Sequence, residues 1–195
     1  MRYVLTTCVL WLCLAAPAWA TSALDYTRAT LTQATAIVAS NQSHNQKLAA
    51  LSVLFRRFLD TDVMGREALG RHWASFTPAQ QKEFLALFRE LMERTYVAKL
   101  LLFDNPKFAY VSSAAIQGQT RVDTQIVTPN DRFDVVYWLS PSADQWKATR
   151  IVVEGVNLTA NLGSQLNDLL SRMSVPELLE LMRQRYGPEP RQRAG

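Results

Sequence analysis

The residues of this chain that could do chemistry are few and lie far apart. His44 and His72 are its two histidines, and its two cysteines both fall within the first 20 residues. No metal-ligand spacing, P-loop or dinucleotide-binding glycine pattern is present. Ser164 follows Gly163 but lacks the second glycine of a G-x-S-x-G elbow. We therefore expect a protein that is not an enzyme and that needs neither a cofactor nor a metal.

The remaining polar candidates have simpler interpretations. His72 could act as an acid or base with Glu67, but a lone histidine beside Trp73 at the end of a short helix is more often a packing or capping residue. Asp60 and Asp62 precede a helix, where carboxylates cap free backbone N–H groups, and we favour that role over metal binding. An enzyme whose turnover depends on His72 or a nearby carboxylate is kept as one alternative hypothesis.

The start of the chain has the pattern of a cleavable signal peptide. Met1-Arg2 is followed by an apolar run from Tyr3 to Ala16 and by Pro17-Ala18-Trp19-Ala20, which predicts cleavage after Ala20 and a periplasmic mature protein. Without cysteines the mature chain must be stabilised by burial, and about 175 residues suffice for one domain. The formal net charge of +4 is mild and dispersed, which argues against a nucleic-acid partner.

The order of hydrophobic periods along the mature chain predicts helices, then strands, then helices again. The best-marked helix begins at Pro78 and should reach Phe103, because Thr77 suits the N-cap and Gln80 suits the third position of a capping box. Short turns separate the strands, and Gly155 should end the last one. The expected helices cover residues 25–41, 47–59, 62–73, 78–103, 158–173 and 176–186, and the expected strands cover residues 107–112, 120–128, 132–140 and 146–154.

These elements predict an α+β domain over residues 21–186, followed by a polar tail over residues 187–195. A helical layer should pack on one face of a small antiparallel four-stranded sheet. The long helix has an unusually broad apolar face, which beyond Tyr96 extends to its far side through Val97, Leu100 and Leu101. Hydrophobic periodicity alone does not distinguish a filled core from a hollow one.

The order and spacing of short motifs along the chain resemble the MlaC family of periplasmic phospholipid-binding proteins, also known as the toluene-tolerance or auxiliary transport component. The resemblance covers nearly all of the mature chain. The matching residues are Phe58 to Asp60, Leu69 to Trp73, Thr77-Pro78, Gln80, Gln81, Phe84, Phe88, Leu91, Thr95-Tyr96, Trp146-Lys147, Val153 to Val156, Leu158, Asn161 and Ser164-Gln165.

This resemblance implies a helical layer on a twisted sheet, with an internal apolar cavity that holds phospholipid acyl chains while the head group stays near solvent. It also implies two partners, an outer-membrane lipoprotein complex and an inner-membrane ABC transporter that carries a lipid-binding ring. The chain departs from the family at Leu162-Gly163, where an aromatic and a basic residue are usual, and at Leu166, which replaces a common phenylalanine. A hopanoid-associated branch shares the Gly-Arg-His-Trp region, so the lipid class stays open.

We predict that the acyl chains contact apolar residues of the long helix and of the sheet. Tyr96 and Tyr137 suit the mouth of a cavity, Arg94 or Arg150 could attract a phosphate, and Gly70 should permit close packing. The alternative is an envelope adaptor protein with a filled core that works only through its surface. The predicted contact residues are Phe84, Phe88, Leu91, Tyr96, Leu100, Phe103, Val135, Tyr137, Leu139 and Val153.

Overall fold

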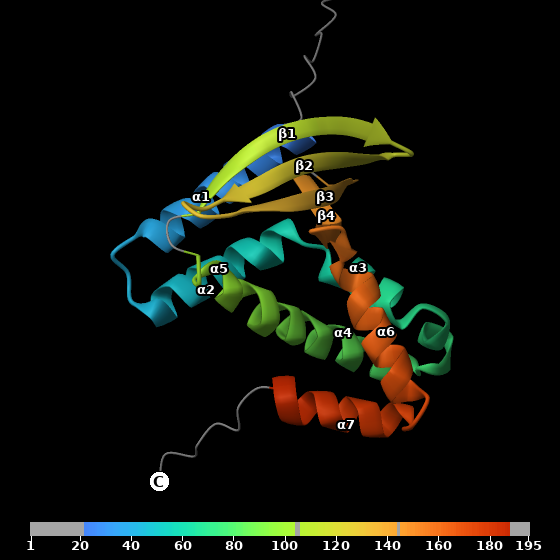
Figure 1. The fold of residues 1–195 in the computed structure, drawn as a ribbon. Coiled ribbons are helices and arrows are strands. Elements are labelled where there is room, and N and C mark those ends of the chain that lie inside the picture. The colour runs from blue at the N-terminus through green and yellow to red at the C-terminus, as the bar shows by residue number, and fades with distance from the viewer. Residues whose placement is uncertain (1–21, 104–105, 144, 188–195) are drawn as a thin grey trace, which may run out of the picture.

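A computed structural model describes residues 22–103, 106–143 and 145–187 of the chain. It confirms the α+β class, with helices packed against one antiparallel sheet (Figure 1). The predicted signal peptide over residues 1–20 and the tail beyond residue 187 lie outside the described residues.

Three helices form the first part of the fold. Helices α1 (Ala23–Ala39), α2 (His44–Phe58) and α3 (Thr61–Leu69) begin at Ser22, Ser43 and Asp60, whose side chains each accept a hydrogen bond from a backbone N–H of the first turn. A 3-10 turn, η1 (Gly70–Ser75), follows α3. The capping role that we favoured for Asp60 is therefore confirmed.

The long helix is not a single α-helix as predicted. Helix α4 (Pro78–Met92) begins with the expected capping box of Thr77 and Gln80, but a π turn, η2 (Glu93–Val97), separates it from the short helix α5 (Ala98–Leu100). A π turn contains one more residue than an α turn and so rotates the side chains of α5 relative to those of α4. The change of apolar face beyond Tyr96 in the sequence coincides with this turn.

The sheet is a meander with five antiparallel strands in the order β1-β2-β3-β4-β5, so the prediction of four strands was wrong. Glu154 and Gly155 have φ values of 49° and 76°, and this tight turn brings β5 back to pair with the end of β4. The strands are β1 (Lys107–Ile116), β2 (Gln119–Val127), β3 (Arg132–Ser142), β4 (Gln145–Val153) and β5 (Val156–Asn157).

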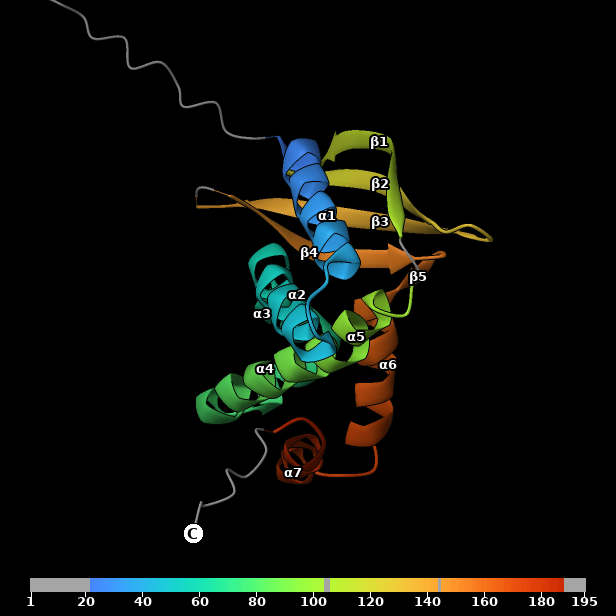
Figure 2. The same cartoon turned by 90° about the vertical axis from the view of Figure 1, so that its left-hand side faces the viewer.

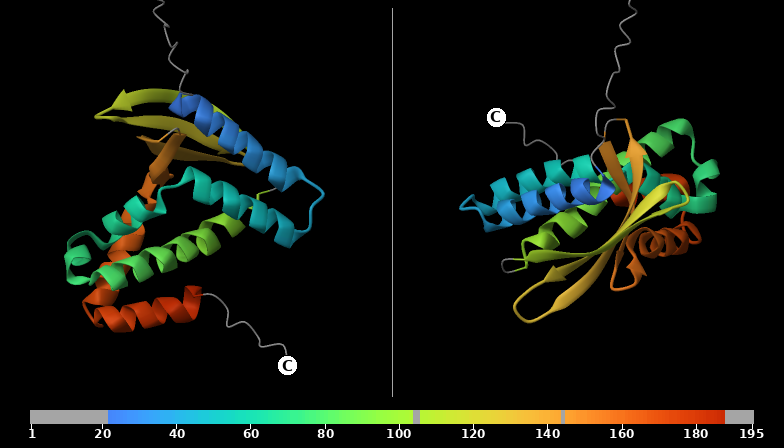
Figure 3. Two further views of the ribbon diagram at one scale, coloured as in Figure 1. Left: turned by 180° about the vertical axis from the view of Figure 1, so that it is seen from behind. Right: turned by 90° about the horizontal axis from the view of Figure 1, so that it is seen from above.

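Helix α1 runs across the strands, and the other helices lie below the sheet in the view of Figure 1 (Figures 1 and 2). Helix α6 (Leu158–Leu170) descends from the end of β5 and crosses α3, and α7 (Val175–Tyr186) packs beside α4. The views from behind and from above show the same stacking of a curved sheet over helices (Figure 3). No helix in the described part of the chain is both long and apolar enough to cross a membrane.

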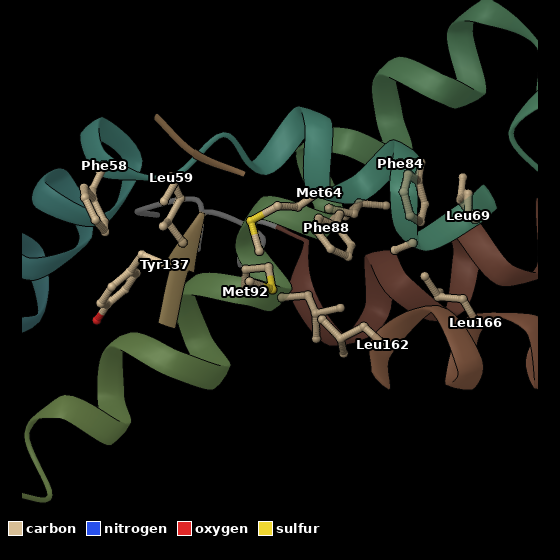
Figure 4. Packing of buried hydrophobic residues seen from close by; sticks show 14 of the residues in the cluster. Phe58, Leu59, Met64, Leu69, Phe84, Phe88, Met92, Tyr137, Leu162 and Leu166 are labelled. Atoms are coloured by element: carbon tan, nitrogen blue, oxygen red, sulfur yellow. The ribbon is translucent and has the colours of Figure 1, made fainter. Parts of the chain in front are cut away.

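The main core lies between α3, α4 and α6 (Figure 4). A Cβ added to Gly163 would lie 2.9 Å from the carbonyl oxygen of Ala68, so Gly163 is the residue that lets α6 approach the backbone of α3. Gly70 has open space around it and a φ of 49°, so our expectation that it permits close packing was wrong. Glycine there allows the chain to leave α3 in a conformation that other residues avoid.

Candidate functional site

An apolar cavity of about 310 Å³ lies between the inner face of the sheet and helices α1, α2 and α5. Of the described residues that line it, all but four are apolar; the four are Thr30, Tyr96, Lys99 and Tyr137. A ligand pocket of this size and composition is suited to a hydrophobic guest. Its walls come from Leu31 and Ala34 of α1, Leu51, Leu54, Phe55 and Phe58 of α2, the adjacent Leu59, Leu100 and Phe103 at the end of the long helix, Phe108, Ile126, Val135, Ile151 and Val153 of the sheet, and Leu158 of α6.

A second hollow of about 700 Å³ lies at the ends of α1 and α2 and shares Phe103 with the cavity. Although it is larger, it is more open to solvent, and Gln42, His44 and Lys47 contribute polar side chains to its wall. Apolar groups gain more from the less open and more apolar cavity, because the hydrophobic effect scales with the area removed from water. We therefore take the smaller, apolar cavity as the candidate site.

The alternation of side-chain direction along the strands places apolar residues on the wall that the sheet contributes to the cavity. Val135 and Tyr137 are two residues apart on β3 and point to the same side, and both are buried. Across the strand pair they face Val153 and Ile151 of β4, which also line the cavity. The apolar alternation in the sequence of these strands therefore produces one continuous wall.

The structure brings six of the ten predicted contact residues to the cavity wall: Tyr96, Leu100, Phe103, Val135, Tyr137 and Val153. The other four, Phe84, Phe88, Leu91 and Leu139, are not part of the wall. They belong to the filled core, where Phe84, Phe88 and Leu139 are 0% exposed and Leu91 is 9% exposed. Helical period identified the buried face of the long helix, but only its last turns lie under the sheet beside the cavity.

Sequence reasoning missed the contribution of α1 and α2 to the wall. Leu51, Leu54, Phe55 and Phe58 follow the i, i+3, i+4, i+7 spacing of one helix face, and all four line the cavity. That spacing was visible in the sequence. It did not show whether this face packs against a neighbour or borders a hollow.

The polar groups of the wall differ in their hydrogen bonding. Thr30 Oγ1 donates to the carbonyl oxygen of Tyr26 at 2.9 Å. The hydroxyl of Tyr137 has no hydrogen-bond partner among the described residues, and burial raises the pKa of this phenol, with a further increase from Tyr110. Burial also raises the pKa of Tyr96, whose ring centroid lies 5.3 Å from Lys99 Nζ. Both phenols therefore remain protonated at neutral pH.

An ion pair between a buried carboxylate and a half-exposed arginine holds the helices together behind the cavity. Glu93 in the π turn is 5% exposed, and its carboxylate accepts hydrogen bonds from Arg56 Nε at 2.6 Å and Nη2 at 2.9 Å. This pair of hydrogen bonds joins α2 to the π turn, which contains Tyr96 and precedes Lys99. The hydrogen bond and the charge of Glu93 raise the pKa of Arg56.

The other polar candidates lie outside the cavity wall. Arg94 donates to the carbonyl oxygens of Arg185 and Gly187, which fastens the end of α7. Arg150 Nη2 lies 3.6 Å from Glu67 and its guanidinium 5.6 Å from the ring centroid of Trp138. Neither arginine lines the cavity that we predicted it to serve.

The acid–base and metal candidates are also accounted for. His72 lies on the 3-10 turn that follows α3 and contacts Arg71 Nε through its Nε2 at 3.4 Å, and it does not line the cavity. Asp62 pairs with Arg89 Nη2 at 3.1 Å. Within residues 22–103, 106–143 and 145–187, no three His, Cys, Asp or Glu side chains are grouped as a metal site would require.

Comparison with known proteins gives a family and a fold. The family model described as MlaC protein matches residues 28–184. Among solved structures, the chain is similar to a phospholipid-binding protein from Ralstonia solanacearum in complex with a phospholipid, with a TM-score of 0.75 and 22% sequence identity. That match covers 85% of this chain and 97% of the other. At this identity, the structural match shows a shared fold.

Proposed function

This chain belongs to the MlaC protein family, and from that membership we propose that it is a phospholipid carrier whose cavity holds acyl chains. The observation that carries the proposal is the apolar cavity enclosed between the sheet and α1, α2 and α5. The related protein from Ralstonia solanacearum was solved with a phospholipid, which favours a phospholipid over a hopanoid-related ligand here.

The energetics of moving a lipid through water explain why a carrier requires such a cavity. Each CH₂ group contributes about 0.8 kcal/mol when it leaves water, so an exposed chain of about 16 carbons costs on the order of 10 kcal/mol. Burying the chain against Val135, Ile151 and Phe58 removes that cost. Delivery then requires a membrane or a partner that binds the lipid or opens the cavity.

We assign the protein to the periplasm, between two membrane systems. The predicted signal peptide supports export, and the family supports two partners, an inner-membrane ABC transporter with a lipid-binding ring and an outer-membrane lipoprotein complex. The carrier would take a lipid from one and deliver it to the other. The adaptor hypothesis has less support, because it requires a filled core where the structure has a cavity.

Lipid uptake by a cavity-filling variant tests the proposal. In Val135→Phe the added ring should occupy the cavity, so phospholipid uptake from vesicles should fall more than tenfold while the free energy of unfolding changes by about 1 kcal/mol or less. Val122→Phe is a matched control, because Val122 lies on the neighbouring strand with 0% exposure and does not line the cavity. It should lose about 2 kcal/mol of stability. Equal uptake by the wild type and Val135→Phe would contradict the proposed site.

A further inference from the structure

Tyr137 carries a hydroxyl that has no hydrogen-bond acceptor among the described residues. Its side chain is 7% exposed, lies in the middle of β3 and lines the cavity. The ring packs edge-on against Phe58, with centroids 5.4 Å apart. Figure 4 shows the phenolic oxygen pointing away from the packed side chains of Met64 and Met92. No donor or acceptor among the described residues bonds to it.

Two other tyrosines near the cavity bond within the protein. The hydroxyl of Tyr26 bonds to Gln145, and that of Tyr110 donates to the carbonyl oxygen of Arg28. Tyr96 has no hydrogen-bond partner among the described residues, but it is only half-buried at the rim beside the exposed Lys99. The fully buried unpaired atoms of the described residues are Arg150 Nε and Thr159 Oγ1, so the hydroxyl of Tyr137 keeps some open surface although its residue is 7% exposed. Since Tyr137 lines the cavity, that surface is available to a ligand, and a hydroxyl in an apolar site gains from finding an acceptor.

On the basis of the proposed function, we propose that the hydroxyl of Tyr137 donates a hydrogen bond to the ester carbonyl oxygen of a bound acyl chain, and that the cavity thereby selects ester-linked lipids. The carbonyl is the one strong acceptor at the junction between the hydrocarbon tails and the head group. A lipid without it would leave the phenol unpaired in an apolar site.

The charge of the cavity favours a neutral acceptor at this depth. Among the described residues of its wall, Lys99 is the one cationic side chain and is exposed at the rim, and the others are uncharged. A phosphate buried beside Tyr137 would lose its hydration without a counter-charge, which is far more costly than burying a carbonyl. Phosphate is accordingly expected near Lys99 and the ester further in. A lipid built of hydrocarbon rings offers neither a phosphate for Lys99 nor an ester carbonyl for Tyr137.

The test is a competition between two lipids that differ only in the ester carbonyl. Mature protein is incubated with vesicles that contain equal amounts of diester and diether phosphatidylglycerol of the same chain length, and bound lipid is quantified by mass spectrometry after reisolation. One hydrogen bond in an apolar site corresponds to about a tenfold preference. We expect the wild type to favour the diester by about that factor relative to Tyr137→Phe, whose ratio should approach that of the vesicles.

Tyr26→Phe is the matched control, since it removes a tyrosine hydroxyl that bonds to Gln145 and does not line the cavity. It should keep the wild-type ratio. An unchanged ratio in Tyr137→Phe, or no preference in the wild type, would overturn the assignment to the ester while lipid binding itself stood. A wild type that takes up neither lipid would overturn the proposed function and this inference together.

Discussion

Glu93 is a carboxylate held almost entirely out of water in the π turn of the long helix, with 5% of its surface exposed. Arg56 of α2 meets it with two parallel hydrogen bonds, while the outer side of Arg56 stays in solvent near Glu90. A forked arginine–carboxylate contact fixes direction as well as distance. The pair therefore sets how α2 lies against the turn that carries Tyr96 into the cavity wall.

Replacing Arg56 by alanine should lower the free energy of unfolding by about 2 kcal/mol, because it leaves a buried carboxylate without its partner. This figure is below that of a fully buried pair, since the side chain of Arg56 is 53% exposed and solvent screens it. Urea unfolding measures the change. The neighbouring Arg57→Ala removes exposed contacts to Gln33 and Tyr26 and should change stability by about 0.5 kcal/mol or less. Equal effects of the two substitutions would contradict the bracing role of Arg56.

Tyr137 shows what sequence reasoning about a single residue can and cannot reach. Its place on an apolar strand face and its amphipathic character could be predicted from the sequence, and both suggested a position at the cavity mouth. The structure places it deeper, with 7% exposure, because β3 is a central strand covered by α1 and α2. The depth of a residue depends on contacts between elements that are distant in sequence.

At the scale of elements, the crossing of α3 and α6 fixes the helical layer beneath the sheet. Gly163 lies at this crossing, where the Ala68 carbonyl oxygen would be 2.9 Å from an added Cβ. Leu162, the residue before Gly163, is buried in the same core. The two residues together allow the close approach of α6 to α3.

Gly163→Ala should destabilise the fold by about 2 kcal/mol, although alanine favours helix formation. The contact is with backbone, so the two helices must move apart to accommodate a methyl group. Thermal or urea unfolding gives the change, and Ser164→Ala on the exposed side of the same helix is the control, with an expected change near zero. A more stable Gly163→Ala protein would show that the helices are not in close contact at this point.

Element types were predictable because local periodicity reflects local burial, and the capping box at Thr77 fixed the start of α4. Two local irregularities could not be predicted from the sequence. The π turn depends on the long-range pairing of Glu93 with Arg56, and β5 depends on a turn that reverses the chain at Glu154 and Gly155. Helical periodicity carries no information about the pairing of Glu93 with Arg56. A glycine after a strand is compatible both with the end of the sheet and with a hairpin to a further strand.

At the scale of the whole molecule, the cavity exists because the sheet, helices α1 and α2, and the end of the long helix do not pack fully against one another. Helix α1 lies across the sheet, α2 and the last turns of the long helix approach from below (Figure 2), and a cavity of about 310 Å³ is left between these elements. Below this level α3, α4 and α6 pack without such a gap, and there Phe84 and Phe88 are fully buried. The sequence pattern is apolar in both regions. Only the arrangement of the elements separates the filled core from the cavity.

Native mass spectrometry of the protein purified from a bacterial periplasm, followed by organic extraction of the bound material, tests the central claim most directly. The account predicts discrete added masses that match diacyl phospholipids on the wild type and their strong reduction in Val135→Phe. It also predicts that Val122→Phe retains lipid in the fraction that remains folded. A wild-type protein with no added mass, and with no uptake from phospholipid vesicles, would contradict the claim that this cavity carries lipid.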